Sequence, residues 1–153
     1  MQANLHPTSD EALAALHEQV NCYRRLVKLA EAQHDHIEQS RTDALLEVLQ
    51  QRAGEVERIG QLEALVAPLR RAWSDLTAGW PVERRVSAES MIAEIRRLLE
   101  RINDSDRSDS LILQQRKLSV GRQLRQAGAA REVNRSYAAA AYGKPAPRMD
   151  VQR

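Results

Sequence analysis

An apolar residue recurs every three or four positions across the first part of this 153-residue chain. The steps alternate between three and four without a break, and one histidine stands in the series. Such spacing places all these side chains on one face of an α-helix and is typical of a coiled-coil seam. We therefore expect a long first helix that buries this face against another helix. The seam positions are Leu13, Leu16, Val20, Tyr23, Val27, Ala30, His34 and Ile37.

A second segment repeats the pattern after a short polar connection near residues 39–42. Two successive steps of three residues, beside Gly54 and Gly60, shift its register, and Pro68 removes one backbone hydrogen bond. We expect a continuous but bent second helix, packed antiparallel on the first because the connection is short. Its seam is Leu45, Leu49, Val56, Ile59, Leu62, Val66, Leu69, Trp73 and Leu76.

A third seam follows the stretch "AGWPVERRVS" and spans residues 88–102. Gly79 is expected in the left-handed conformation at the end of the second helix, and Pro81 should stop any continuation. The seam residues of this third helix are Ala88, Met91, Ile95, Leu98 and Ile102. The expected N-caps of the three helices are Ser9, then Ser40 or Thr42, and finally Ser87.

The composition supports an all-α fold. Phe is absent, aromatic residues make up 3% of the chain, and charged residues make up 29%. Ala, Leu, Glu, Gln and Arg dominate, and straight side chains of this kind lose little rotamer freedom in a helix. The sequence lacks the alternating β-branched runs of strands.

The polar run "NDSDRSDS" at residues 103–110 contains no apolar residue. Because Asn, Asp and Ser compete for backbone hydrogen bonds, a loop or a pronounced bend is expected there, with a solvated helical stretch as the alternative. We predict a disordered N-terminus at 1–8, a helical bundle at 9–110, a weakly packed C-terminal helix at 111–143 and a disordered tail at 144–153.

The charge is divided between these parts. From Leu111 onward there are nine Lys and Arg against two acidic residues, a net charge of +7, whereas residues 1–110 carry 14 basic and 19 acidic side chains, a net charge of −5. An acidic body with a basic arm indicates different partners for the two parts.

No constellation of residues indicates catalysis, a metal or a cofactor. His34 and His36 of "HDHIE" point about 200° apart on a helix, so they cannot share an ion without other ligands. The single cysteine, Cys22, has no nearby base to activate it and fits a reducing compartment. With no long apolar run and no secretory leader pattern, we expect a cytoplasmic protein without membrane insertion and without enzymatic activity.

The C-terminal helix suits binding of a helix from another protein. Its apolar residues form narrow rows that thin to alanines, and small residues permit close approach of a partner helix. Two other roles stay open: oligomerisation as a structural coiled coil, and nucleic-acid binding through the basic arm, although no stacking platform or helix-turn-helix accompanies the charge. The expected partner-binding residues are Leu111, Leu113, Leu118, Val120, Leu124, Ala127, Val133 and Tyr137.

Two stretches resemble the FlgN-type flagellar export chaperones. The first is "DALLEVLQQRAGEVERIGQLEALV", which fits the family pattern at Leu45, Leu46, Arg52, Glu55 and Ile59. The second is "DSLILQQRKLSVGRQLRQAGAAREVNRSYAAAAYG", which fits it at Leu113, Leu118, Leu124, Asn134, Tyr137, Tyr142 and Gly143.

This resemblance covers residues 9–143 and implies a cytoplasmic chaperone that works without ATP. Such proteins keep hook-associated flagellar proteins unassembled and deliver them to the flagellar export gate, gripping an amphipathic client helix with the C-terminal helix. The resemblance implies that the client contacts the partner-binding residues listed above and that Tyr137 and Tyr142 contact the export gate. The identity of the client, and a homodimer through the first two helices, stay open.

Overall fold

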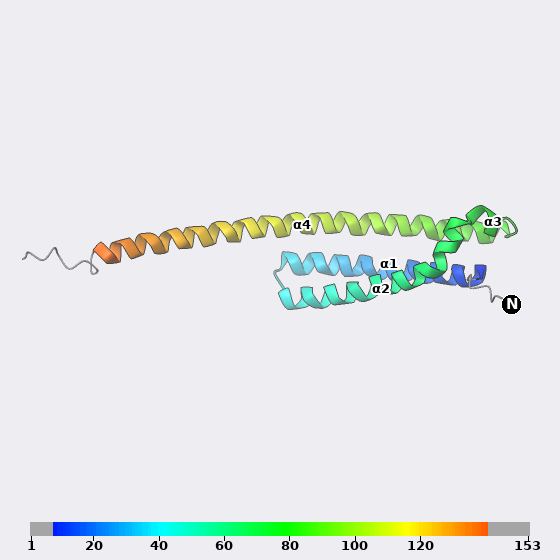
Figure 1. Ribbon diagram of the computed structural model, residues 1–153, viewed down its shortest axis with the longest axis horizontal. Helices are drawn as coiled ribbons and strands as arrows, with labels where there is room; N and C mark the ends of the chain where they lie inside the picture. The colour runs from blue at the N-terminus through cyan, green and yellow to red at the C-terminus, as the bar shows by residue number, and fades with distance from the viewer. Residues whose placement is uncertain (1–7, 141–153) are drawn as a thin grey trace, which may run out of the picture. The chain divides into compact units, whose positions relative to one another are not determined.

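The computed structural model describes residues 8–140, and within that range the regular structure is entirely helical. The helices are α1 (Ser9–Glu38), α2 (Thr42–Arg71), the short α3 (Trp73–Thr77) and the long α4 (Val82–Ala138) (Figure 1). The all-α prediction is confirmed. The predictions of disorder for residues 1–7 and 144–153 lie outside the described residues.

The chain divides into two compact units, Met1–Ser110 and Leu111–Arg153, with the boundary inside α4. We call residues 8–110 the body and residues 111–138 the C-terminal segment, and describe each by itself.

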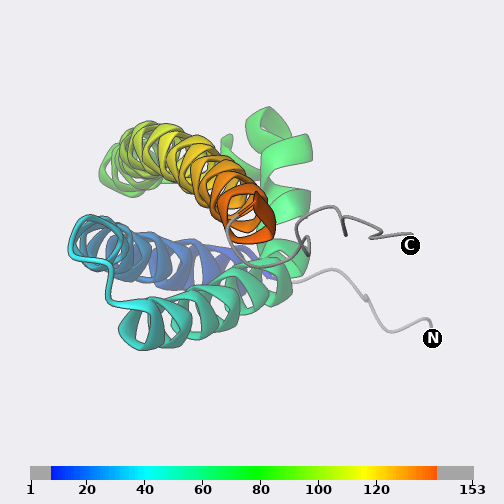
Figure 2. The same cartoon turned by 90° about the vertical axis from the view of Figure 1, so that its left-hand side faces the viewer.

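The body is built on an antiparallel hairpin of α1 and α2, as the sequence predicts (Figures 1 and 2). Residues 39–41 connect the two helices, and Ser40 adopts a left-handed backbone with φ 55°. The first part of α4 lies alongside the hairpin and adds its own apolar face to the core.

The core follows the predicted seams closely. One cluster joins Leu16 and Val20 of α1 to Val66 of α2 and Ala88 of α4, all at most 3% exposed. A second cluster consists of Leu26, Val27, Leu98 and Ile102, from α1 and α4 alone. Tyr23 and Ile59 pack on both clusters at their margin and are half-buried.

The second seam is only partly right. Leu62, Val66 and Leu69 are buried as predicted, but Leu49 and Val56 of α2 are 44% and 57% exposed. Leu76 is 41% exposed and lies on the separate helix α3, because α2 ends at Arg71. Val48 is buried in place of Leu49. The register skip explains why Leu49 and Val56 are exposed. The face shared by the buried residues after the skip does not run back along the helix to those two positions. The helix does continue through the skip and past Pro68 to Arg71, as predicted.

Helix boundaries differ from the sequence prediction in four places. Thr8 rather than Ser9 caps α1, because Glu11 then lies three residues on and completes a capping box with Thr8. At α2 the N-cap position is Arg41, with no side-chain cap bond, since Ser40 forms the left-handed turn and Thr42 is already helical.

The other two differences flank Pro81. No described glycine, Gly79 included, has positive φ, and the chain instead turns through a bond from the Trp80 amide to the Thr77 carbonyl. α4 begins at Val82 instead of near Ser87, because the Pro81 carbonyl already accepts the first helical bond, from the Arg85 amide.

The largest correction concerns residues 103–110, where we expected a loop or bend. They are helical throughout, and α4 is one continuous 57-residue helix.

Candidate functional site

The C-terminal segment exposes a series of large apolar side chains. Leu111, Leu118 and Leu124 are 61%, 61% and 68% exposed, and Tyr137 is 71% exposed. The predicted residues Leu113, Val120, Ala127 and Val133 are exposed as well. Of the predicted contacts with an export gate, Tyr137 is thus accessible, whereas Tyr142 lies outside the described residues.

These apolar side chains form two rows on opposite sides of the helix. At about 100° per residue, Leu111, Leu118 and Val133 fall within about 60° of one another, and we call them the first row. The second row lies about 180° away and consists of Leu113, Val120, Leu124 and Ala127. One partner helix covers one side of a helix, so a single docked helix can bury only one row at a time.

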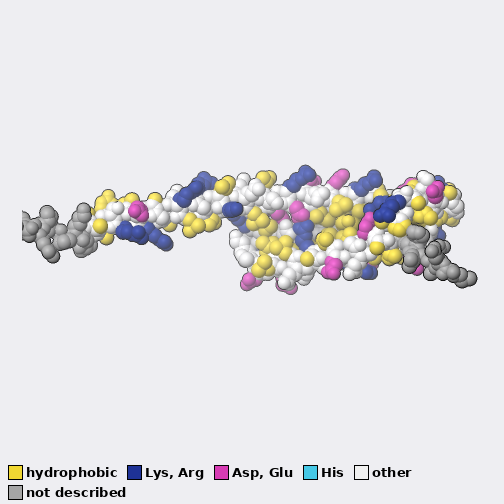
Figure 3. Space-filling view, in the orientation of Figure 1, with side chains coloured by type: hydrophobic (Ala, Val, Ile, Leu, Met, Phe, Trp, Pro, Cys, Tyr) yellow, Lys and Arg dark blue, Asp and Glu magenta, His cyan; other side chains and the backbone are white. Residues whose placement is uncertain are grey.

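Basic side chains surround the helix and lie both between and within the rows. Within the described part of the segment, Glu132 is the only acidic residue against six Lys and Arg. Figure 3 shows hydrophobic and basic side chains interspersed along this helix. Beside Leu118, a shallow depression forms where Gly121 has no side chain, bordered by Gln114, Lys117 and Arg125. The surface therefore offers apolar contact flanked by positive charge.

The body holds a polar cluster that was missed in the sequence. Asp109 of α4 is 2% exposed, and its two carboxylate oxygens accept a hydrogen bond from Gln33 Nε2 at 2.9 Å and contact His34 Nδ1 at 2.7 Å. Arg52 of α2 donates to both oxygens of Asp106, at 2.7 and 2.9 Å, and to Gln33 Oε1. We call these five residues the polar clasp.

The polar clasp explains why residues 103–110 are helical. Hydrogen bonds to α1 and α2 fix Asp106 and Asp109, so these carboxylates do not compete for the backbone. The Asp109 carboxylate also raises the pKa of His34, with Glu38 and Asp35 adding to the effect. Asp106 likewise raises the pKa of Arg52. His36, on the other side of α1, is half-buried.

A sequence signal for the clasp did exist. The buried positions Ala88, Ile95 and Ile102 are seven residues apart, and the next position of that series is Asp109. In α1, Val20 and Val27 lead in the same way to His34. Both seven-residue series thus end on polar residues that contact each other, an arrangement that can fix the register of packed helices.

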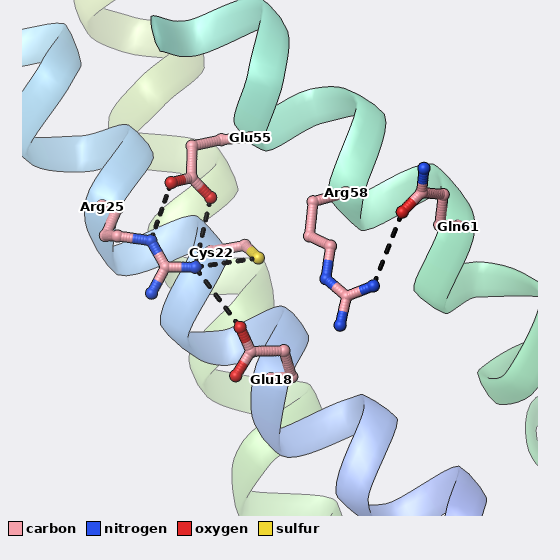
Figure 4. A network of polar contacts seen from close by, with 6 residues as sticks. All are labelled: Glu18, Cys22, Arg25, Glu55, Arg58 and Gln61. Atoms are coloured by element: carbon pink, nitrogen blue, oxygen red, sulfur yellow. Dashed lines mark hydrogen bonds and ion pairs between the residues drawn. The ribbon is translucent and has the colours of Figure 1, made fainter.

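Cys22 belongs to a second polar network, which Figure 4 shows at close range. Arg25 donates to both oxygens of Glu55, at 2.8 and 3.2 Å, and to Glu18 and the Cys22 sulfur at longer distances. Arg25 lowers the pKa of Glu55, whereas burial raises the pKa of the fully buried Cys22 thiol. A raised pKa disfavours the thiolate that nucleophilic catalysis requires.

Neither a metal cluster nor a membrane span is found in the described range. Within residues 8–140, no three His, Cys, Asp or Glu side chains lie close enough to hold an ion. None of the four helices has the length and apolarity needed to cross a bilayer.

Comparison with known proteins identifies no relative: no protein-family model, curated protein or solved structure matches the chain. Functional inference therefore rests on the residues and geometry above.

Proposed function

We propose that this protein is a cytoplasmic flagellar export chaperone that holds a hook-associated protein through its C-terminal segment and delivers it to the export gate. One observation carries the proposal: seven large apolar side chains between Leu111 and Tyr137 are 46–71% exposed on a regular helix. Exposed apolar surface of this kind marks a site of interaction with another molecule. The resemblance of the sequence to the FlgN-type family suggests the class of client, the hook-associated proteins, and leaves the individual client open.

The mechanism we propose is helix-in-groove recognition. An amphipathic client helix buries its apolar face on one row of the C-terminal segment, and the flanking arginines contact its polar margin. The body supplies a stable core of its own, so binding and release do not require the body to unfold. No nucleotide is needed, because release is driven by handover to the next partner.

The test is calorimetric titration of the full-length chain with a purified hook-associated protein from the same organism. Two double variants separate the rows: Leu111→Asp with Leu118→Asp, and Val120→Asp with Leu124→Asp. Each should leave the circular dichroism of the body unchanged. The double variant in the row that the client covers should lose at least a hundredfold in affinity for the client, because a carboxylate would enter a dry interface.

The matched control is Arg122→Ala with Arg125→Ala, in the same stretch of helix. Exposed ion pairs contribute about 0–1 kcal/mol each, so the loss for the arginine pair should stay below about thirtyfold.

Two outcomes would favour the other roles. If the arm binds nucleic acid, the arginine double variant should lose the most affinity for nucleic acid. The slope of log affinity against log salt concentration should then become shallower by about two. If the protein is a structural coiled coil, the two apolar double variants should change the mass of a homo-oligomer, measured by ultracentrifugation. The wild-type chain should then show no affinity for a client. A wild-type chain without measurable affinity for any hook-associated protein would refute the chaperone proposal.

A further inference from the structure

The body carries a groove that its own core leaves open. It lies between α2 and α4, with Tyr23 of α1 among its lining residues, and encloses about 700 Å³. Val56 and Ile59 line one wall, and Ile92, Ile95 and Leu99 line the other. Figure 3 shows hydrophobic side chains gathered between α4 and the hairpin on the face turned to the viewer.

Two side chains of the groove are poorly covered for apolar residues at the edge of a core. Val56 is 57% exposed and Leu99 is 36% exposed, and they lie on opposite walls. The lining residues of α4 extend over eight positions, from Ile92 to Leu99, or about 10 Å of helix axis. That length matches two turns of a docked helix.

Gly60 opens the α2 wall. A glycine in a helix interior costs about 1 kcal/mol relative to alanine. The fold does not require it, since its φ is not positive and a Cβ built on Gly60 would meet nothing within 4 Å. Without a side chain there, the backbone of an incoming helix can approach α2 closely.

Charge selects the kind of helix. The charged residues of the lining are Glu63, Arg70 and Arg96, and Glu63 is already paired with Arg70 at 2.6 Å. Arg96 has no hydrogen bond or ion pair with any residue of the described range 8–140. The groove is therefore net positive, with one cation available for a carboxylate. The basic C-terminal segment of a second copy would be repelled.

We propose that this groove is a second docking site, which takes two turns of an acidic amphipathic helix of a partner protein. The apolar face of that helix covers Val56, Ile59 and Leu99, and a carboxylate at its margin pairs with Arg96. This inference does not depend on the export role, since it rests on the body alone.

The experiment uses two synthetic 15-residue helical peptides with identical Leu and Ala positions, flanked by Glu in one and by Lys in the other. Each is labelled with fluorescein and titrated with the full-length chain, and binding is followed by anisotropy. The chain carries Leu118→Asp and Leu124→Asp, so that the exposed rows of the C-terminal segment do not compete. We expect the Glu peptide to bind at least tenfold more tightly than the Lys peptide.

A matched pair of variants then locates the site. Gly60→Leu fills the groove and should weaken the Glu peptide at least tenfold, while the higher helix propensity of Leu keeps the body folded. Gly54→Leu makes the same change on the same helix, also in open space but outside the groove, and should leave binding unchanged. Arg96→Glu should reverse the preference in favour of the Lys peptide.

Three results would overturn the proposal. They are no saturable binding of the Glu peptide up to about 1 mM, equal effects of the two leucine variants, and an unchanged preference in Arg96→Glu. The calorimetric test of the export role uses other variants and another partner, so the two proposals can fail separately.

Discussion

The body and the C-terminal segment use apolar residues in opposite ways. In the body, leucines and valines on three helices face one another, and Leu16 and Val20 are at most 1% exposed. In the C-terminal segment, leucines at similar helical spacing, such as Leu111 and Leu118, are more than 60% exposed. The comparison teaches that apolar periodicity alone does not make a core. What separates the two regions is whether another helix is present to cover the face.

Introducing an aspartate in each region should therefore have very different effects on stability. Val20→Asp places a carboxylate in the core, and we expect it to lower the stability of the body by about 4 kcal/mol or more, or to prevent folding. Leu118→Asp should change stability by less than about 0.5 kcal/mol, because the side chain is already in water. Urea unfolding followed by circular dichroism measures both. Similar losses of stability for the two variants would contradict the difference between the regions.

The polar clasp should contribute a smaller but clear share of the stability of the body. Asp109→Ala leaves the amide of Gln33 and the ring of His34 without their buried acceptor, at a cost of about 2–3 kcal/mol. Asp104→Ala is the matched control in the same polar stretch, since Asp104 is 77% exposed and its one ion pair within residues 8–140 is with Arg107, at 3.9 Å. The control should change the free energy of unfolding by less than about 0.5 kcal/mol. Equal effects would mean that the clasp does not hold residues 103–110.

Replacing the two glycines of the C-terminal segment tests whether that segment can be stabilised independently of the body. Gly121→Ala and Gly128→Ala should each strengthen the helix locally by about 1 kcal/mol, because neither new methyl group meets another atom within 4 Å. Amide exchange within residues 111–138 should slow, while the unfolding midpoint of the body stays constant. A shift of that midpoint would show that the two regions unfold as one.

The smallest expected effect is a pH dependence of the clasp. The pKa of His34 is raised in the folded chain by Asp109, so its stabilising contribution is complete below about pH 6.5, the unfolded value, and is lost as the pH rises through the raised folded value. Stability measured between about pH 5.5 and 8.5 should fall across this window. His34→Gln should flatten that part of the curve, and an unchanged slope would contradict the assignment.

Much of the body could be predicted from sequence because its seams are regular. The steps from Leu13 to Ile37 and from Ala88 to Ile102 define faces that the structure buries. The prediction of a loop at residues 103–110 was wrong because Asp can occur both in loops and at a buried helical position. Asp and Ser favour loops when solvated, but Asp109 continues the seven-residue series of Ile95 and Ile102 and is stabilised from α1.

The candidate binding surfaces could be predicted only in part. The exposed rows followed from the sequence because they lie on one helix, so spacing alone places Leu113, Val120 and Leu124 together. The groove could not be found in this way. Its walls come from α2 and α4, and it depends on Val56 being left out of the core by the register skip.

The body buries its own core whereas the C-terminal segment exposes its apolar rows, and amide hydrogen exchange of the free, monomeric chain measures this difference. We predict slow exchange over Ser9–Glu38 and at least a hundredfold faster exchange over residues 111–138, since few apolar contacts protect the latter. Addition of a hook-associated protein should slow exchange in residues 111–138 selectively. Equal protection of both regions in the free chain would contradict the account.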